Sequence, residues 1–142
     1  MWTTSHQGTT SATPTAVWDA LQALHSGTAL GPNSDVFELH GPFDVGTRLT
    51  ITPQGQDSLE SVITELERDV VYADQTTYGS ITLTFRHHLD PTPSGGTVVT
   101  HQLEIVGEGA DEVGPELGAQ ISSDFPATMD ELLAAAERGV RG

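Results

Sequence analysis

The chain has 142 residues, the size of one compact domain, and we expect residues 1–142 to fold as a single unit. Its 20 acidic side chains, five arginines and absence of lysine give a formal net charge of −15, which argues against nucleic acid and anionic membranes as partners. Cysteine is absent, and neither a secretion signal nor an apolar stretch of about 18 residues occurs, so the sequence predicts a cytoplasmic protein without disulfides or thiolate metal sites.

The N-terminal part predicts a strand and then a short helix. Residues 2–11 are rich in threonine, which favours an extended strand. Thr13 before Pro14 is a helix start signal, because a threonine hydroxyl can cap the first turn and proline suits the first helical position. The helix should end near Gly27, and residues 27–35 contain too much glycine, proline and asparagine to be regular. Apolar side chains recur at helical spacing at Val17, Trp18, Leu21 and Leu24.

The middle of the chain, from Val36 to Gly107, has the two-residue period of antiparallel strands. Five or six short runs alternate apolar and polar side chains, and the glycine, proline and aspartate residues between them are typical of hairpin turns and bulges. A sheet of this kind has one apolar face that another element has to cover. The runs lie at residues 36–41, 46–53, 61–67, 70–79, 81–90 and 97–107.

The C-terminal part predicts one long helix over residues 114–138, after an acidic linker at residues 108–114. Pro126 interrupts the helical pattern and should kink the helix there. This helix is the large apolar partner available to the sheet, so the sequence predicts an α+β helix-grip fold in which a curved antiparallel sheet wraps around the helix. Its apolar face consists of Leu117, Ile121, Phe125, Met129, Leu132, Leu133 and Ala136.

Several phrases of the sequence resemble one superfamily: ATPTAVWDALQAL, HGPFDVGTRLTITP, VITELE, FRHHLDP and GGTVVTHQLEIVG. They resemble the SRPBCC or START-like proteins, in particular the polyketide cyclase/dehydrase branch, which is related in fold to the Bet v 1 allergens. The resemblance covers nearly the whole chain and implies the same helix-grip fold. Many members of the superfamily carry a tryptophan-rich loop after the first helix, whereas residues 27–35 contain no aromatic residue. The sequence leaves open whether residues 26–35 close a cavity.

Histidines on the last two predicted strands are the first candidates for a chemical site. His87 and His101 each share the apolar parity of their strand, so both should point inward, whereas His88 should point to solvent. An odd-numbered hairpin loop places His87 opposite His101 or one diagonal step away, within about 4.5 to 8 Å between Cβ atoms. The pair could be interior histidines bonded to neighbours, ligand-binding or acid–base groups, or two ligands of a metal.

A metal or cofactor site is not expected from these histidines. A catalytic zinc or iron site requires a third protein ligand, and His40 lies on the polar parity of its strand. The sequence does not fix which way His6 and His25 face. We also find no inward carboxylate to name as a general base, and no motif of a metalloprotease, a serine hydrolase or a phosphate-binding loop.

The sequence supports two main functions and one weaker one. The first is binding of a small hydrophobic or amphipathic molecule between the sheet and the C-terminal helix. The second is a polyketide cyclase, aromatase or dehydratase, in which His87 and His101 act as acid–base groups. The third is an interaction protein that uses its acidic surface or forms a homodimer through an open sheet edge. The candidate ligand contacts are Phe85, His87, His101, Leu103, Tyr78, Phe125 and Met129, with the hydroxyl of Tyr78 facing inward.

Overall fold

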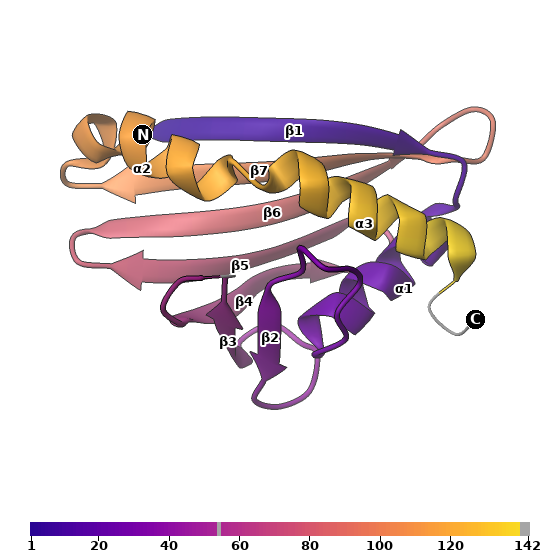
Figure 1. Cartoon of the computed structure of the whole chain (residues 1–142), viewed down its shortest axis with the longest axis horizontal. Coiled ribbons are helices and arrows are strands. Elements are labelled where there is room, and N and C mark those ends of the chain that lie inside the picture. The colour runs from indigo at the N-terminus through magenta and orange to yellow at the C-terminus, as the bar shows by residue number, and fades with distance from the viewer. Residues whose placement is uncertain (54, 140–142) are drawn as a thin grey trace.

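The computed structural model describes residues 1–53 and 55–139, which form a curved antiparallel sheet with three helices (Figure 1). The strands are hydrogen-bonded in the order β1-β7-β6-β5-β4-β3-β2, and the α+β helix-grip prediction is confirmed. The strands are β1 (Trp2–Thr10), β2 (Val36–Leu39), β3 (Arg48–Thr52), β4 (Leu59–Glu67), β5 (Val71–Tyr78), β6 (Ile81–Pro91) and β7 (Thr97–Gly107), and the helices are α1 (Pro14–His25), α2 (Ala110–Ser122) and α3 (Phe125–Arg138).

The sheet keeps the predicted alternation along its central strands. In β6 and β7, apolar side chains on one parity are buried and the other parity is more exposed, so one face of the sheet is covered by the helices. The register of β4 against β5 shifts between Ile63 and Glu65, which is a β-bulge. Bulges increase the local twist of a strand and help a sheet to curve. The curvature gives the helices an inner face to pack against.

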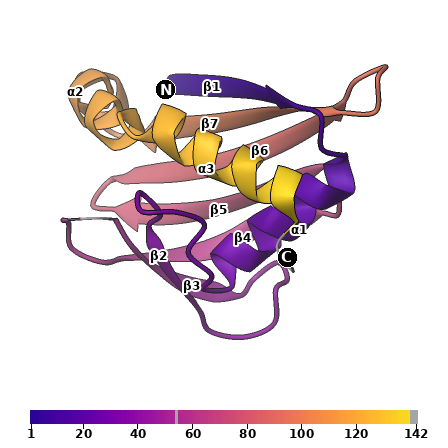
Figure 2. The same cartoon turned by 45° about the vertical axis from the view of Figure 1, so that its right-hand side comes forward.

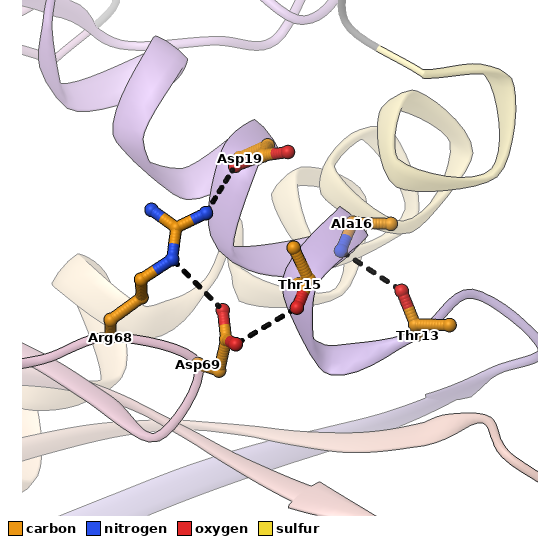
Figure 3. Close-up of polar contacts among 6 residues, drawn as sticks. All are labelled: Thr13, Thr15, Ala16, Asp19, Arg68 and Asp69. Carbon is orange, nitrogen blue, oxygen red and sulfur yellow. Dashed lines mark hydrogen bonds and ion pairs between the residues drawn. The ribbon is translucent and has the colours of Figure 1, made fainter.

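Helix α1 starts as the sequence predicts and is tied to the β4–β5 turn. The hydroxyl of Thr13 caps the helix by accepting a hydrogen bond of 3.1 Å from the backbone amide of Ala16. Thr15 donates to Asp69 in the turn at 2.8 Å, as Figure 3 shows. Arg68 of the same turn pairs with Asp19 of α1 at 3.5 Å. These contacts fix α1 across the end of the sheet, where it packs against α3 (Figure 2).

The C-terminal part forms two helices, and the prediction of one kinked helix is wrong. Helix α2 begins at Ala110, inside the segment expected to be a linker, and α3 begins at Phe125. Pro126 lies in the first turn of α3, where its missing N–H would have no partner inside the helix in any case. The proline therefore starts a helix here, and residues 123–124 form the break. Among the described helices, none combines the length and apolar character needed to cross a lipid bilayer.

The hydrophobic core has two parts, one under α1 and α3 and one under α2. In the second part the indole of Trp2 lies against α2 at two glycines, Gly114 and Gly118, which are one helical turn apart. A Cβ on Gly114 would come within 2.5 Å of the Trp2 Cβ, so only glycine allows β1 and α2 to approach this closely. Gly8 of β1 similarly allows Met129 of α3 to lie against the strand.

Candidate functional site

A cavity of about 320 Å³ lies between the inner face of the sheet and the helices. Strands β5, β6 and β7 supply one wall, α1 and β2 supply another, and the α2–α3 junction covers the opposite side. Residues 30–35, the segment after α1, contribute to the wall as well. Its apolar lining includes Leu24, Phe37, Ile51, Phe85, Ile121 and Phe125.

His87 and His101 face this cavity together, which confirms their predicted inward orientation. They are directly paired in the β6–β7 register, and their rings stack with centroids 3.9 Å apart and planes inclined by 19°. The ring of Phe125, at the start of α3, stacks on the other face of His101 at 3.8 Å. His88 is exposed on the opposite face of β6, as its parity predicts. Two imidazoles from neighbouring strands thus form one edge of the cavity.

His25, at the end of α1, is a third histidine of the cavity wall. Its ring lies 4.0 Å from that of Tyr72 and 5.9 Å from that of His87, measured between centroids. Its Nδ1 lies 2.8 Å from the backbone carbonyl oxygen of Leu21. A carbonyl oxygen only accepts hydrogen bonds, so Nδ1 carries the proton in the neutral ring and Nε2 carries the lone pair. His25 therefore offers the cavity an acceptor of fixed tautomer.

All three histidines are neutral near neutral pH. Burial lowers the pKa of His25 to about 4, a shift opposed in part by its backbone hydrogen bond to Leu21. Burial, with smaller effects of the charges of His25 and His6, lowers the pKa of His101 to about 3. Burial and the charges of His101 and His25 hold the pKa of His87 well below its usual range. The histidines thus act in the cavity as neutral hydrogen-bonding groups.

Asp74 of β5 is a buried carboxylate on the cavity wall, so the prediction that no carboxylate points inward is wrong. It is 2% exposed, and it accepts hydrogen bonds from the hydroxyl of Tyr72 at 2.7 Å and from that of Ser61 at 3.0 Å. Burial raises the pKa of Asp74 to about 6, although the two hydrogen bonds favour the charged form. Burial and the neighbouring Asp74 raise the pKa of the Tyr72 hydroxyl. The Tyr72 hydroxyl therefore stays protonated and donates a hydrogen bond to Asp74.

Four of the seven predicted ligand contacts line the cavity, and three do not. Phe85, His87, His101 and Phe125 belong to its wall. Leu103 and Met129 are buried in the two parts of the core and contribute packing rather than lining. Tyr78 is 64% exposed, so the prediction of an inward hydroxyl is wrong. It shares the parity of Tyr72 and Asp74, but it is the last residue of β5 and lies beyond the cavity.

The cavity residues that the sequence analysis missed carried a usable signal. Asp74 lies two residues after Tyr72, so strand parity places the two side chains on the same face of the sheet. His25 follows Leu21 by four residues, which places it on the buried face of α1. His6 pairs with His101 across β1 and β7 and is half-buried outside the cavity wall. The sequence shows which face of its own element each residue occupies, but it does not show that His25 and Asp74 meet in one cavity.

Residues 30–35 are held over the cavity by Glu131 of α3. One carboxylate oxygen of Glu131 accepts hydrogen bonds from the backbone amide of Asn33 at 2.9 Å and from its side-chain amide at 2.7 Å. A Cβ on Gly31 would come within 2.5 Å of the Glu131 carboxyl carbon, so a larger residue here would force the Glu131 carboxylate to move. The segment that lacks an aromatic residue thus still contributes Leu30 and Asn33 to the cavity wall.

Charged side chains in the cavity wall are all acidic in the part of the chain that the structure describes. They are Asp35, Asp74, Asp124 and Glu131, and no arginine joins them. Over residues 1–53 and 55–139, no group of three or more histidine, cysteine, aspartate or glutamate side chains converges in a way that could hold a metal ion. The wall can donate and accept hydrogen bonds, move a proton at Asp74, and attract positive charge.

Comparison with known proteins shows the fold. No family model and no curated protein matches the sequence. Among solved structures, the Zhui aromatase/cyclase of a Streptomyces species has a TM-score of 0.76 at 17% identity, with 96% of this chain and 94% of that chain covered. The protein Ara h 8.0201 has a TM-score of 0.74 at 14% identity, with 97% and 99% covered.

Norcoclaurine synthase from Thalictrum flavum, solved in complex with dopamine and hydroxybenzaldehyde, has a TM-score of 0.73 at 15% identity, with 96% of this chain and 87% of that chain covered. Identities this low carry no statement about activity. All three alignments, however, cover nearly the whole of this chain. The chain therefore has the Bet v 1-like helix-grip fold, as the resemblance in its sequence implied.

Proposed function

We propose that the protein binds a small hydrophobic or amphipathic molecule in the cavity between the sheet and the helices. The observation that carries the proposal is the cavity of about 320 Å³, whose wall combines apolar side chains with polar groups that include Tyr72, Asp74 and the histidines. Small-molecule sites are usually concave and mostly apolar, with a few convergent polar groups. Structural neighbours that include an aromatase/cyclase and a synthase solved with two small aromatic molecules support the same use of this fold.

Binding can be tested with a neutral apolar fluorescent probe such as N-phenylnaphthylamine. We expect one probe per chain and a dissociation constant that rises by about tenfold or more in Ile121→Trp, because the larger side chain fills the cavity from α2. Ala119→Trp places the same side chain on the exposed face of α2 and is the matched control. Equal affinity of the two variants would place the probe elsewhere and contradict the proposal.

Native mass spectrometry of the purified protein adds an independent measurement. A small molecule retained in the gas phase, and absent from Ile121→Trp, would identify the ligand directly. The Ala119→Trp protein should retain it. Retention by both variants, or by neither Ala119→Trp nor the unmodified protein, counts against the cavity as the place of binding.

A second candidate is an enzyme of the cyclase, aromatase or dehydratase kind, and Asp74 is the observation that favours it. General acid–base catalysis works best with a pKa near the working pH, and burial raises the pKa of Asp74 to about 6. Asp74 lies in the same cavity wall as His87 and His101, which can hold a carbonyl oxygen or pass a proton. In an enzyme, His87→Gln and His101→Gln should abolish turnover of a poly-β-keto substrate; in a binding protein they only weaken binding.

The other expectations about partners and location stay predictions. A single unit over residues 1–142, a cytoplasmic location and the absence of nucleic-acid or membrane partners are inferred from length, charge and composition, and a homodimer is inferred from an open sheet edge. The homodimer has a direct check in size-exclusion chromatography with light scattering. A monomeric mass at high protein concentration would contradict it.

A further inference from the structure

The cavity wall carries negative charge, because its charged side chains are all carboxylates within the described residues. The chain has no lysine, and the arginine that comes nearest in sequence to the cavity histidines, Arg86, lies on the other parity of β6. There it pairs with Glu65 at 2.6 Å and donates to Gln102 at 3.1 Å. A negatively charged ligand would therefore meet repulsion on every charged part of the wall.

Asp74 is the deepest of these carboxylates and has only neutral partners. Its hydrogen bonds come from the hydroxyls of Tyr72 and Ser61, at 2.7 and 3.0 Å. Two hydrogen bonds leave part of the acceptor capacity of a carboxylate unused. A buried charge is normally paired with an opposite charge, and no cationic side chain of the described residues fulfils that role for Asp74. The wall thus offers a ligand cation an unshared negative partner in a low-dielectric site.

The groups around Asp74 suit an ammonium group as well. Tyr72 donates its hydroxyl hydrogen bond to Asp74, so the lone pairs of the phenol oxygen can accept a hydrogen bond from a ligand. Nε2 of His25 carries a lone pair, and the aromatic residues Phe37 and Phe85 belong to the same wall. An ammonium ion has three donors and is attracted to aromatic faces.

His87 gives a second and independent sign of a ligand at this end of the cavity. It is 8% exposed and lines the cavity, yet its Nδ1 is buried without a hydrogen-bond partner in the described residues. Buried polar atoms are rarely left unpaired in native proteins. A polar atom of a ligand, or a shift of the ring on binding, would satisfy it.

We propose that the cavity selects amines: small apolar molecules with one ammonium group that pairs with Asp74 and Tyr72, in preference to carboxylates or phosphates with the same apolar body. This inference rests on the proposed binding function and names the class of ligand for the same site. The apolar body lies against Phe85, Ile121 and Phe125, while the ammonium reaches the β5 side of the cavity.

Three matched probes test the proposal on the unmodified protein: naphthylmethylamine, naphthylmethanol and naphthoate. They share a ring system and differ in head-group charge, and titration at about pH 8 keeps both the amine and Asp74 charged. We expect the amine to bind about tenfold or more tighter than the alcohol, because a charge-assisted contact replaces a neutral one. Naphthoate should bind weaker than the alcohol.

Two variants locate the effect. Asp74→Asn should lower the affinity for the amine by about tenfold or more and change that for the alcohol by less than about threefold. Asp124→Asn removes a charge from the half-buried rim of the cavity and should change both affinities by less than about threefold. Circular dichroism confirms that each variant is folded.

The outcomes separate this inference from the proposed function. Binding of the alcohol with no preference for the amine overturns the inference and leaves the binding function in place. Preference for naphthoate overturns the inference as well. Failure of all three probes, together with failure of N-phenylnaphthylamine, overturns the proposed function itself. An amine preference that survives Asp74→Asn but disappears in Asp124→Asn contradicts the assignment to Asp74.

Discussion

Asp74 is the cavity group whose charge changes closest to neutral pH. Burial raises its pKa to about 6, compared with 3.8 for an exposed aspartate. The folded protein therefore holds this proton more tightly than the unfolded chain does. Asp74 stabilises the fold fully below pH 3.8, and that contribution is lost as the pH rises through 6.

Asp74→Asn removes this titration and keeps the shape of the side chain, with an oxygen that can still accept from Tyr72. We expect the free energy of unfolding of the variant, relative to the wild type, to increase by on the order of 2–3 kcal/mol between about pH 4 and about pH 7. Urea unfolding at several pH values measures it. Asp57→Asn, at an exposed position, is the control. If the difference in free energy of unfolding between Asp74→Asn and the wild type stays constant over this pH range, the assigned pKa shift is refuted.

The inward histidines could be predicted from the sequence because strand parity is a property of the backbone. His87 and His101 needed only the alternation of their own strands. The residues that share the cavity wall with them could not be predicted in the same way, because His25 comes from α1 and Asp74 from β5. Tyr78 shows the limit of parity: the rule gives the side of the sheet and says nothing about where along the strand the cavity ends.

A side chain of a distant helix helps to hold the segment between α1 and β2. Glu131 accepts both hydrogen bonds from Asn33 across 98 residues of sequence. No local pattern in residues 26–35 contains this information, so the sequence could not decide whether the segment covers the cavity. The break between α2 and α3 has the same origin. Pro126 suits a kink and a first turn equally, so the sequence alone does not distinguish one kinked helix from two helices.

Glu131→Ala should release residues 30–35 from α3. We expect amide hydrogen exchange in this segment to become faster by roughly tenfold, with a loss of about 1–2 kcal/mol in the free energy of unfolding, because the hydrogen bonds from Asn33 and Ser34 to this carboxylate are removed. Hydrogen-exchange mass spectrometry measures the segment directly. Asp130→Ala, at the exposed neighbouring position, is the matched control. Equal exchange in the two variants would mean that Glu131 does not hold the segment.

Helix α2 is placed on β1 by the contact between Gly118 and Trp2. A Cβ on Gly118 would overlap the six-membered ring of Trp2, so Gly118→Ala should destabilise the protein by about 1–3 kcal/mol even though alanine favours a helix by about 1 kcal/mol. Urea unfolding gives the value. The double variant with Trp2→Leu, which shortens the side chain, should recover most of the loss relative to Trp2→Leu alone. An unchanged loss in that background would show that the two residues are not coupled.

The protein as a whole should be sensitive to acid because three histidines are buried in neutral form. Burial lowers the pKa of His25 to about 4 and that of His101 to about 3, and it lowers that of His87 as well. The unfolded chain takes up these protons at pH values near 6.5. The stabilising contribution of the three histidines is complete above pH 6.5 and is lost as the pH falls toward 4, against the smaller opposite effect of Asp74.

We expect the midpoint of thermal unfolding to fall steeply between about pH 6.5 and about pH 4. In His101→Gln, the number of protons taken up on unfolding, which sets the slope, should decrease by about one. Calorimetry over this range measures both. His88→Gln removes the exposed histidine of β6 and should leave the steepness closer to the wild type. The same decrease in both variants would indicate that burial of His101 is not the cause.

The α+β class, the sheet and its order of hairpins could be predicted because the period of two and the turn residues recur along most of the chain. The strands near residues 36–107 all appear, and Thr13 caps α1 as expected. The cavity could not be predicted to the same depth. Its residues come from β2 to β7 and all three helices. The cavity therefore depends on how these elements pack together, which the pattern of any one segment does not predict.

Aromatic rings form a continuous row that starts at Phe125, passes through the three cavity histidines to Tyr72, and ends at Phe43 and Trp18. Phe43 lies parallel to Tyr72 at 5.7 Å and meets the indole of Trp18 edge-on at 6.1 Å. A molecule that displaces the Tyr72 ring should also change the surroundings of the Trp18 indole, because Phe43 contacts both rings. The fluorescence emission of Trp18, measured in a Trp2→Phe variant, should therefore report whether a ligand occupies the cavity, without an added dye.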